Sequence, residues 1–102
     1  MNSENKVVEF KHNDLQWIRD FLKKIDVNHM RVKREDSDII LQSGELTSPI
    51  YHIRFRRHNE SVWGMDIAKH DGGWAETPYY GSCEDMMYIL AQSFEWVLTK
   101  ID

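Results

Sequence analysis

The segment IYHIRFRRHNESVWGMDIAKH, residues 50–70, decides the fold because apolar residues recur in it at every second position. The residues with this spacing are Tyr51, Ile53 and Phe55 in the first half and Trp63, Met65 and Ile67 in the second. Successive side chains of a strand point to opposite faces of a sheet. The pattern therefore predicts two strands with one apolar face toward the core, joined as a hairpin by the short link at residues 57–61.

Shorter extended segments on both sides indicate that these two strands belong to an antiparallel meander. Residues 30–33 alternate between apolar and basic, and residues 39–41 form a short apolar run after a polar turn. Residues 43–49, SGELTSP, are typical of a loop. Downstream, the Asp-Gly pair at 71–72 favours a turn with positive φ, followed by a third short strand around residues 73–77. We expect a sheet of three or four strands.

Helical periodicity flanks this sheet-forming region. Apolar residues at three- and four-residue steps predict a helix over about residues 14–25, with Asn13 as its N-terminal cap. The same spacing over residues 86–101 predicts a long helix that begins after Ser82 and continues almost to the end of the chain. Asp85, three residues after Ser82, forms an acidic variant of the capping box.

The order of these elements predicts a single α+β domain over residues 1–102. The chain length is that of one ordinary domain. We expect two layers: an N-terminal helix, an antiparallel meander of three to four strands, and a long C-terminal helix packed on one face of the sheet, with the other face open to water. Residues 1–9 are expected to form a loose arm or a short entering strand.

The net charge and the single cysteine argue against several classes of protein function. The net charge is −4, with 17 acidic and 13 basic residues, so the overall field does not attract nucleic acid or anionic membranes. The single cysteine, Cys83, excludes an internal disulfide and a multi-cysteine zinc site, and is compatible with a reducing compartment. No apolar run has the length of a signal peptide core or a membrane span. We therefore expect a cytoplasmic protein that does not bind membranes.

Catalytic motifs are missing from the sequence. The five histidines are scattered, no pair has the spacing of a helical metal site, and no glycine-rich phosphate loop or nucleophile elbow occurs. Cys83 is followed by Glu84 and Asp85, whose charges disfavour a thiolate. We expect a protein that is not an enzyme and that uses no metal and no cofactor.

The segment HDGGWAETPYYGS, residues 70–82, predicts a first candidate surface. Its glycines, proline and serine are explained by turns, a strand end and a helix cap. These structural roles leave an aromatic cluster beside a carboxylate, a composition typical of protein interfaces. The cluster consists of Trp74, Glu76, Tyr79 and Tyr80.

A basic strand face predicts a second candidate surface. Four basic or titratable residues at alternate positions would project side by side from the open sheet: His52, Arg54, Arg56 and His58. Their charges either pair with acidic neighbours such as Asp66 and Glu76, or form a strip for phosphates or an acidic partner protein. Arginines around His52 and His58 would disfavour protonation of both rings. If the strip binds an acidic partner, we expect binding to strengthen on mild acidification.

These surfaces favour a binding function. The leading prediction is a small protein-binding module, such as an inhibitor, immunity protein, adaptor or chaperone, that recognises a protein partner through the aromatic cluster and the basic strand face. The alternative is a nucleic-acid-binding protein that uses the basic strand face, and the open sheet face would also suit a homodimer. The element order resembles that of the double-stranded RNA-binding domain, but the acidic segment SCEDMM, residues 82–87, occupies the place where that family carries lysines.

Overall fold

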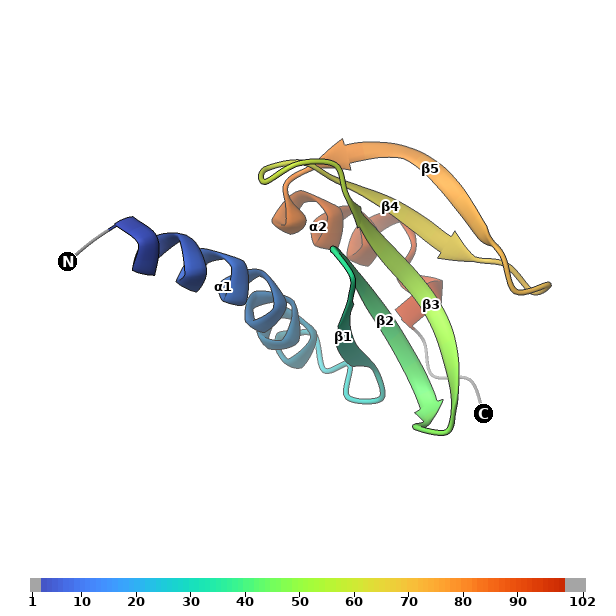
Figure 1. Ribbon diagram of the computed structural model, residues 1–102. Coiled ribbons are helices and arrows are strands. Elements are labelled where there is room, and N and C mark those ends of the chain that lie inside the picture. The colour runs from blue at the N-terminus through green and yellow to red at the C-terminus, as the bar shows by residue number, and fades with distance from the viewer. Residues whose placement is uncertain (1–2, 99–102) are drawn as a thin grey trace.

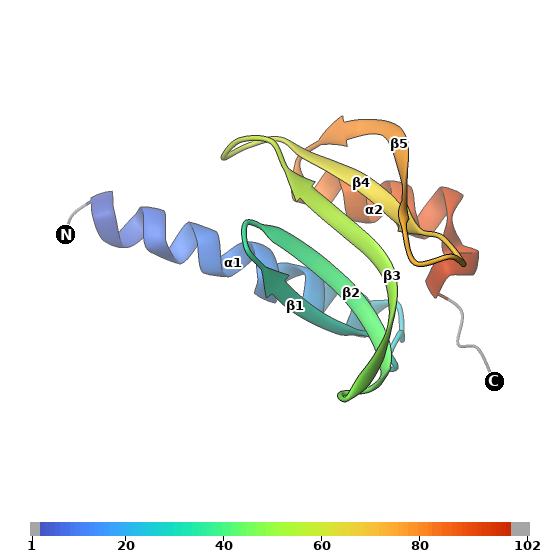
Figure 2. The same ribbon diagram turned by 45° about the vertical axis from the view of Figure 1, so that its right-hand side comes forward.

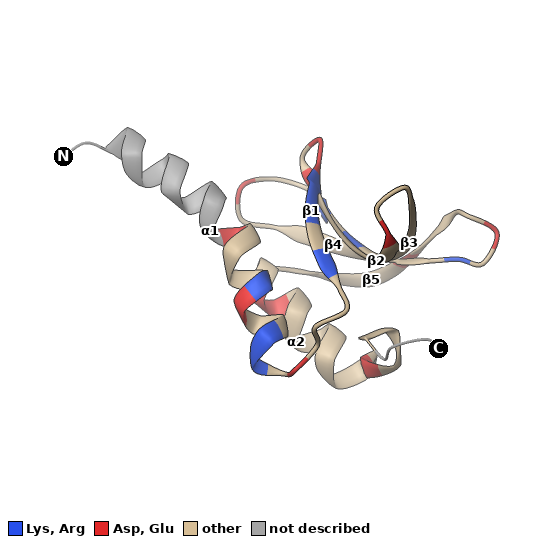
Figure 3. Ribbon diagram, turned by 90° about the horizontal axis from the view of Figure 1, so that it is seen from below, with Lys and Arg blue, Asp and Glu red and all other residues tan. Residues whose placement is uncertain are grey.

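A five-stranded antiparallel sheet carries two helices on one of its faces (Figures 1 and 2). The computed structural model describes residues 3–98 of the chain and the side chains of residues 14–98. The elements in chain order are α1 (Ser3–Lys24), β1 (Arg31–Glu35), β2 (Asp38–Glu45), β3 (Ser48–Arg57), β4 (Trp63–Ala68), β5 (Trp74–Gly81), α2 (Cys83–Ser93) and the 3-10 helix η1 (Glu95–Leu98). The predicted two-layer α+β arrangement is confirmed, and Figure 3 shows α2 and the second half of α1 on the same side of the sheet.

The sheet is a simple meander in which each strand pairs with the next along the chain. It has five strands where three or four were expected, because both short segments, around residues 30–33 and 39–41, form strands of the sheet, β1 and β2. The segment 43–49, expected to be a loop, belongs mostly to strands. β2 continues to Glu45 and β3 starts at Ser48, which leaves only residues 46–47 as a tight turn between them. Gly44, next to the last residue of β2, has a φ of 81°. β5 also runs past Pro78, which lies on an edge strand at an irregularity of its pairing with β4, where proline is tolerated.

The N-terminal helix is longer than its sequence pattern indicated. α1 begins at Ser3, so the expected cap Asn13 lies inside the helix, and the helix occupies most of the segment expected to be an arm or strand. Residues 1–2 of that segment lie outside the described part of the chain. Good helix formers at Glu4, Lys6 and Glu9 explain why the helix does not stop at a local capping signal.

The C-terminal helix has the predicted beginning and a different end. The capping box is confirmed: the Asp85 N–H donates to Ser82 Oγ at 3.0 Å, and the Ser82 N–H donates to Asp85 Oδ2 at 3.3 Å. The expectation of a long helix is wrong, because α2 ends at Ser93 and a 3-10 turn follows. The break lets Phe94 pack edge-on against the aromatic ring of Tyr79. Residue 101, the last in the expected helix, lies outside the described residues.

The hydrophobic core lies between the sheet and the helices. Ile18 and Leu22 of α1 and Leu90 of α2 pack against apolar side chains from all four strands β1–β4. The largest fully buried side chains, Trp63 and Phe55, come from the two strands whose alternation predicted the sheet. Buried aromatic rings remove large apolar areas from water, so these residues contribute strongly to folding.

Candidate functional site

The outer face of the sheet, the face without helices, carries one continuous row of side chains across all five strands. Direct cross-strand partners share a face of a sheet. The row therefore consists of Lys33, Ile40, Arg54, Asp66 and Glu76, each the partner of the next. Ile40 is only 1% exposed although it takes no part in the helix-side core, so other side chains cover it on this face.

A buried carboxylate organises the polar side chains of the outer face. Asp66 is fully buried and accepts hydrogen bonds on both oxygens. Arg54 donates to Oδ2 from Nε at 2.9 Å, and its Nη2 forms an ion pair with the same oxygen at 2.8 Å. Arg56 donates to Oδ2 from Nε at 3.0 Å and to Oδ1 from Nη2 at 2.9 Å. Burial alone would raise the pKa of Asp66, but the hydrogen bonds from Arg56 and Arg54 outweigh it and hold this pKa below its usual value.

Aromatic rings extend this arrangement toward the start of β5. The Arg54 guanidinium lies over the Trp74 ring, with 5.0 Å between its central carbon and the ring centroid. Tyr51 stacks on the same indole at a centroid distance of 6.2 Å and an interplanar angle of 26°. The arginine thus combines charge-assisted hydrogen bonds to Asp66 with a cation–π contact, which fixes the guanidinium in one orientation.

A second aromatic group lies at the other end of β5. Tyr80 packs on His58 with ring centroids 4.8 Å apart, and Arg56 Nη1 lies 3.2 Å from His58 Nε2. Both Tyr80 and Arg56 cross over Gly64, where a Cβ atom would meet Tyr80 Cε1 at 3.1 Å and Arg56 Nη2 at 3.3 Å. The glycine therefore lets both side chains lie flat on β4.

A β-bulge removes His52 from the predicted strip. The register passes from Leu41–Ile53 to Gln42–Tyr51, so β3 holds one extra residue and its alternation shifts there. Tyr51, expected to point into the core, shares Trp74 with Arg54 on the outer face and is 43% exposed. His52 is instead buried, with its Nε2 2.7 Å from Ser43 Oγ.

The cause of the pKa shift at His52 also differs from the expected one. Burial is the main reason that the pKa of His52 lies below its usual value of 6.5, and His29 adds a smaller effect of the same sign. The arginines of the outer face were expected to produce this shift. His52 therefore gives no support to the expected strengthening of partner binding in mild acid.

A second irregularity removes Tyr79 from the predicted aromatic cluster. The pairing of β4 with β5 passes from Asp66–Glu76 to Gly64–Tyr80, so that residues 77–79 all lie opposite Met65. The Thr77 hydroxyl donates to the Met65 carbonyl at 2.8 Å and holds this wide bulge. Tyr79 packs against the core instead of standing beside Tyr80.

The aromatic cluster and the basic strand face, predicted as two separate surfaces, thus belong to one surface. Most of the predicted residues meet on the outer face, and Tyr51 joins them. The set comprises Tyr51, Arg54, Arg56, His58, Trp74, Glu76 and Tyr80, arranged around Asp66. Of the two alternatives for the arginines, the structure shows pairing with Asp66. Sequence periodicity did not predict that Tyr51 lies on the outer face, because the alternation of apolar residues does not reveal the bulge in β3.

Three further features bear on function: the cysteine thiol, candidate metal ligands and the apolar length of the helices. Burial is the main reason that the pKa of Cys83 rises to about 12, with smaller contributions from Asp14 and Glu84, so this thiol is protonated at neutral pH. Within residues 14–98, no group of three or more His, Cys, Asp or Glu side chains is placed to hold a metal ion. Neither described helix is long and apolar enough to cross a membrane.

Comparison with known proteins adds no second source of evidence about this surface. The chain matches no family model, no curated protein and no solved structure. Its own residues and their geometry therefore carry the functional argument.

Proposed function

We propose that the protein is a non-enzymatic binding module that holds a protein partner on the outer face of its sheet, as an inhibitor, immunity protein, adaptor or chaperone does. One observation carries the proposal: the aromatic and basic residues meet on a single face, where buried Asp66 holds both arginines. A cytoplasmic location is part of this proposal and rests on the composition of the chain.

The residue types of the outer face support a protein partner. Trp, Tyr and Arg dominate the binding energy of protein interfaces because they bury large areas and still offer a polar group. Here the aromatic side chains lie at both ends of the face, with Trp74 and Tyr51 at one end and Tyr80 at the other. This spacing offers two anchoring points on either side of the arginines.

The arginines are preorganised, which lowers the entropic cost of binding. A free arginine side chain loses considerable rotamer freedom when a partner immobilises it. Arg54 is already fixed by Asp66 and Trp74, and Arg56 by two hydrogen bonds to Asp66. About a quarter of each arginine side chain remains accessible, at 27% and 23%, so both can still contact a partner.

The charge balance of the outer face argues against the nucleic-acid alternative. Two arginines are offset by Asp66, which binds both of them, and by Glu76, which is the cross-strand partner of Asp66. Lys33, at the β1 end of the row, pairs with Glu35 at 3.5 Å. Phosphate binding depends on an excess of positive charge that can replace counterions. A face with balanced charges and exposed rings fits a protein surface of mixed polarity better.

The proposal is tested by affinity capture with a matched pair of tyrosines. Tyr80 on the outer face and Tyr88 on α2 are both 51% exposed, and Tyr88 packs on Trp17 and Phe21 of α1. We expect the wild-type chain to retain one stoichiometric protein from a lysate of its source cells. Tyr80→Ala should weaken retention about tenfold or more, the loss of an interface hot spot, while Tyr88→Ala should not.

Two results would contradict the proposal. One is retention of the same partner by Tyr80→Ala and Trp74→Ala at wild-type levels; the other is an equal loss with Tyr88→Ala. Circular dichroism of each variant shows whether the fold is intact, so that a loss of retention can be assigned to the surface.

A further inference from the structure

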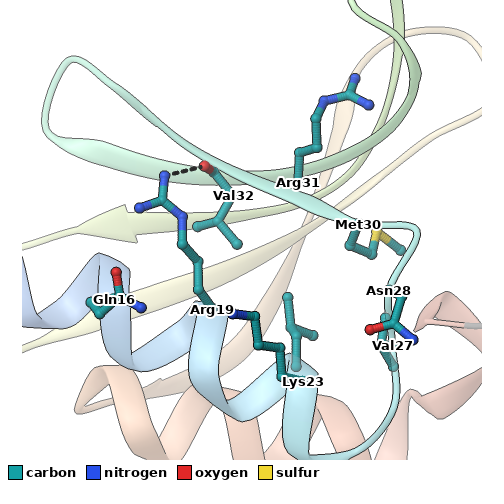
Figure 4. Close-up of a pocket in the computed structure, with 9 residues that line it drawn as sticks. Gln16, Arg19, Lys23, Val27, Asn28, Met30, Arg31 and Val32 are labelled. Carbon is teal, nitrogen blue, oxygen red and sulfur yellow. Dashed lines mark hydrogen bonds between the residues drawn. The ribbon is translucent and has the colours of Figure 1, made fainter.

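A groove lies between the second half of α1 and strand β1, at the edge of the sheet (Figure 4). Its volume is about 390 Å³, within the range of ligand-binding clefts. Arg19 and Lys23 of α1 line one wall, and buried Leu22, Met30 and Val32 form an apolar floor. None of these residues belongs to the outer face.

The groove is positively charged although the chain carries a net charge of −4. No Asp or Glu side chain of the described residues lines it; Asp20 accepts a hydrogen bond from Gln16 at 2.9 Å and lies outside the lining. Figure 3 shows Lys and Arg on both the second half of α1 and β1. Arg31 points its guanidinium away from the groove, toward the Gly44 and Ser43 carbonyls. Arg19 and Lys23 are therefore the charges that face an occupant.

The floor of the groove includes a free strand edge. β1 is an outermost strand, and the Val32 carbonyl accepts a hydrogen bond from Arg19 Nη2 at 3.2 Å. Its partner is thus a side chain of α1 and not β2, which places this carbonyl on the side of β1 away from β2. Alternate residues of an antiparallel strand direct both the N–H and the C=O away from their partner. The Val32 N–H therefore lies on the same free edge.

From this geometry we propose that the groove binds an extended acidic segment of a protein, which adds to β1 as a sixth strand. Carboxylates of the segment pair with Arg19 and Lys23, and its backbone pairs with the free edge at Val32. Strand addition of this kind takes its affinity from backbone hydrogen bonds and its specificity from alternate side chains. The proposal does not depend on the function proposed for the outer face.

Spacing and bond strength both favour this occupant. Side chains four residues apart on a helix lie about 5–6 Å apart, and alternate side chains of a strand about 7 Å apart. Two carboxylates separated by one residue can therefore meet Arg19 and Lys23 together. A hydrogen bond from arginine to a carboxylate is also stronger than one to a neutral carbonyl. Arg19 would then exchange the Val32 carbonyl for a carboxylate, which frees that carbonyl for the incoming strand.

The test is an NMR titration of the full chain with a capped peptide of the sequence Thr-Glu-Thr-Glu-Thr, whose length matches the five residues of β1. We expect saturable shifts of the Val32 amide signal and slower hydrogen exchange at that amide. The peptide Thr-Lys-Thr-Lys-Thr should bind about tenfold or more weakly, since it loses the charge-assisted hydrogen bonds. Absence of a Val32 response to the acidic peptide would overturn the proposal.

Matched variants separate the groove from general attraction to acidic peptides. Lys23→Glu should weaken binding about tenfold or more, whereas Lys24→Glu, the same charge change at an exposed neighbour outside the groove, should have a much smaller effect. Equal effects of the two variants would show that the groove is not the site. Tyr80→Ala should leave peptide binding unchanged, so the result is independent of the outer face.

Methylation of the peptide backbone tests the strand addition itself. Replacing the N–H groups of the three threonines by N–CH₃ removes hydrogen-bond donors and leaves both carboxylates in place. We expect this peptide to bind about tenfold or more weakly. Binding as tight as that of the unmethylated peptide would show that charge alone holds it, and would overturn strand addition.

Discussion

At the scale of single residues, His52 makes the stability of the protein depend on pH. Its pKa in the folded chain lies below the usual 6.5, mainly because burial disfavours the charged ring. The unfolded chain therefore binds the proton more tightly than the folded chain does, and stability falls as the pH falls. The contribution of neutral His52 is complete above pH 6.5 and is lost progressively as the pH drops from there toward the lower folded pKa.

We predict that His52→Gln reduces this loss of stability in mild acid. Glutamine has no proton to gain in this range and can keep a hydrogen bond to Ser43. Urea unfolding at several pH values between about 7.5 and 5 measures the effect. His70→Gln, in the exposed turn before β5, serves as the control for the replacement of an imidazole. A His52→Gln profile parallel to that of the wild type would contradict the assignment.

Residue pairs that follow from regular alternation could be predicted, and those at bulges could not. The sequence placed Asp66 near the arginines of β3 correctly, because a hairpin between two alternating strands brings Arg54 and Asp66 together. Tyr51 and His52 were assigned to the wrong faces. One extra residue in β3 reverses the side on which each neighbour lies, and its position depends on pairing with β2, which no short stretch of β3 reveals.

At the scale of elements, the capping box of α2 gives a stability prediction. Ser82 Oγ accepts from the Asp85 N–H, one of the N–H groups that the first turn of a helix leaves without a partner. We predict that Ser82→Ala lowers the free energy of unfolding by about 1 kcal/mol, measured by urea titration. Ser61→Ala, in an exposed loop, should change it by less than about 0.5 kcal/mol. Equal effects of the two substitutions would mean that the cap contributes nothing measurable.

Element type was easier to predict than element length. Strand alternation, the turn at Gly72 and the cap at Ser82 are local signals, and all three are confirmed. The end of α2 is set by packing at a distance: the chain leaves the helix after Ser93, and Phe94 then packs on Tyr79. The helical spacing of the apolar residues continues past this point, so periodicity could not show the break.

At the scale of the whole molecule, charge is distributed unevenly over an acidic chain. On the outer face, carboxylates offset the two arginines and Lys33. The groove beside β1 presents Arg19 and Lys23 without a lining carboxylate. The net charge of −4 would repel acidic partners at long range, so only local surfaces can attract them. The class of partner that each surface attracts thus depends on whether nearby carboxylates offset its basic side chains.

This balance predicts that one substitution on the outer face creates affinity for nucleic acid. We expect no binding of mixed-sequence RNA by the wild-type chain at about 0.1 M salt, because Asp66 offsets the arginines. Asp66→Asn should give weak binding that falls steeply with added salt, measured by fluorescence anisotropy.

Since it leaves two arginines without their carboxylate, the Asp66→Asn variant should lose about 3 kcal/mol of stability, and circular dichroism must confirm its fold. Glu84→Gln makes the same change in net charge away from this face and should bind no RNA. Salt-dependent RNA binding by the wild type would favour the nucleic-acid function instead.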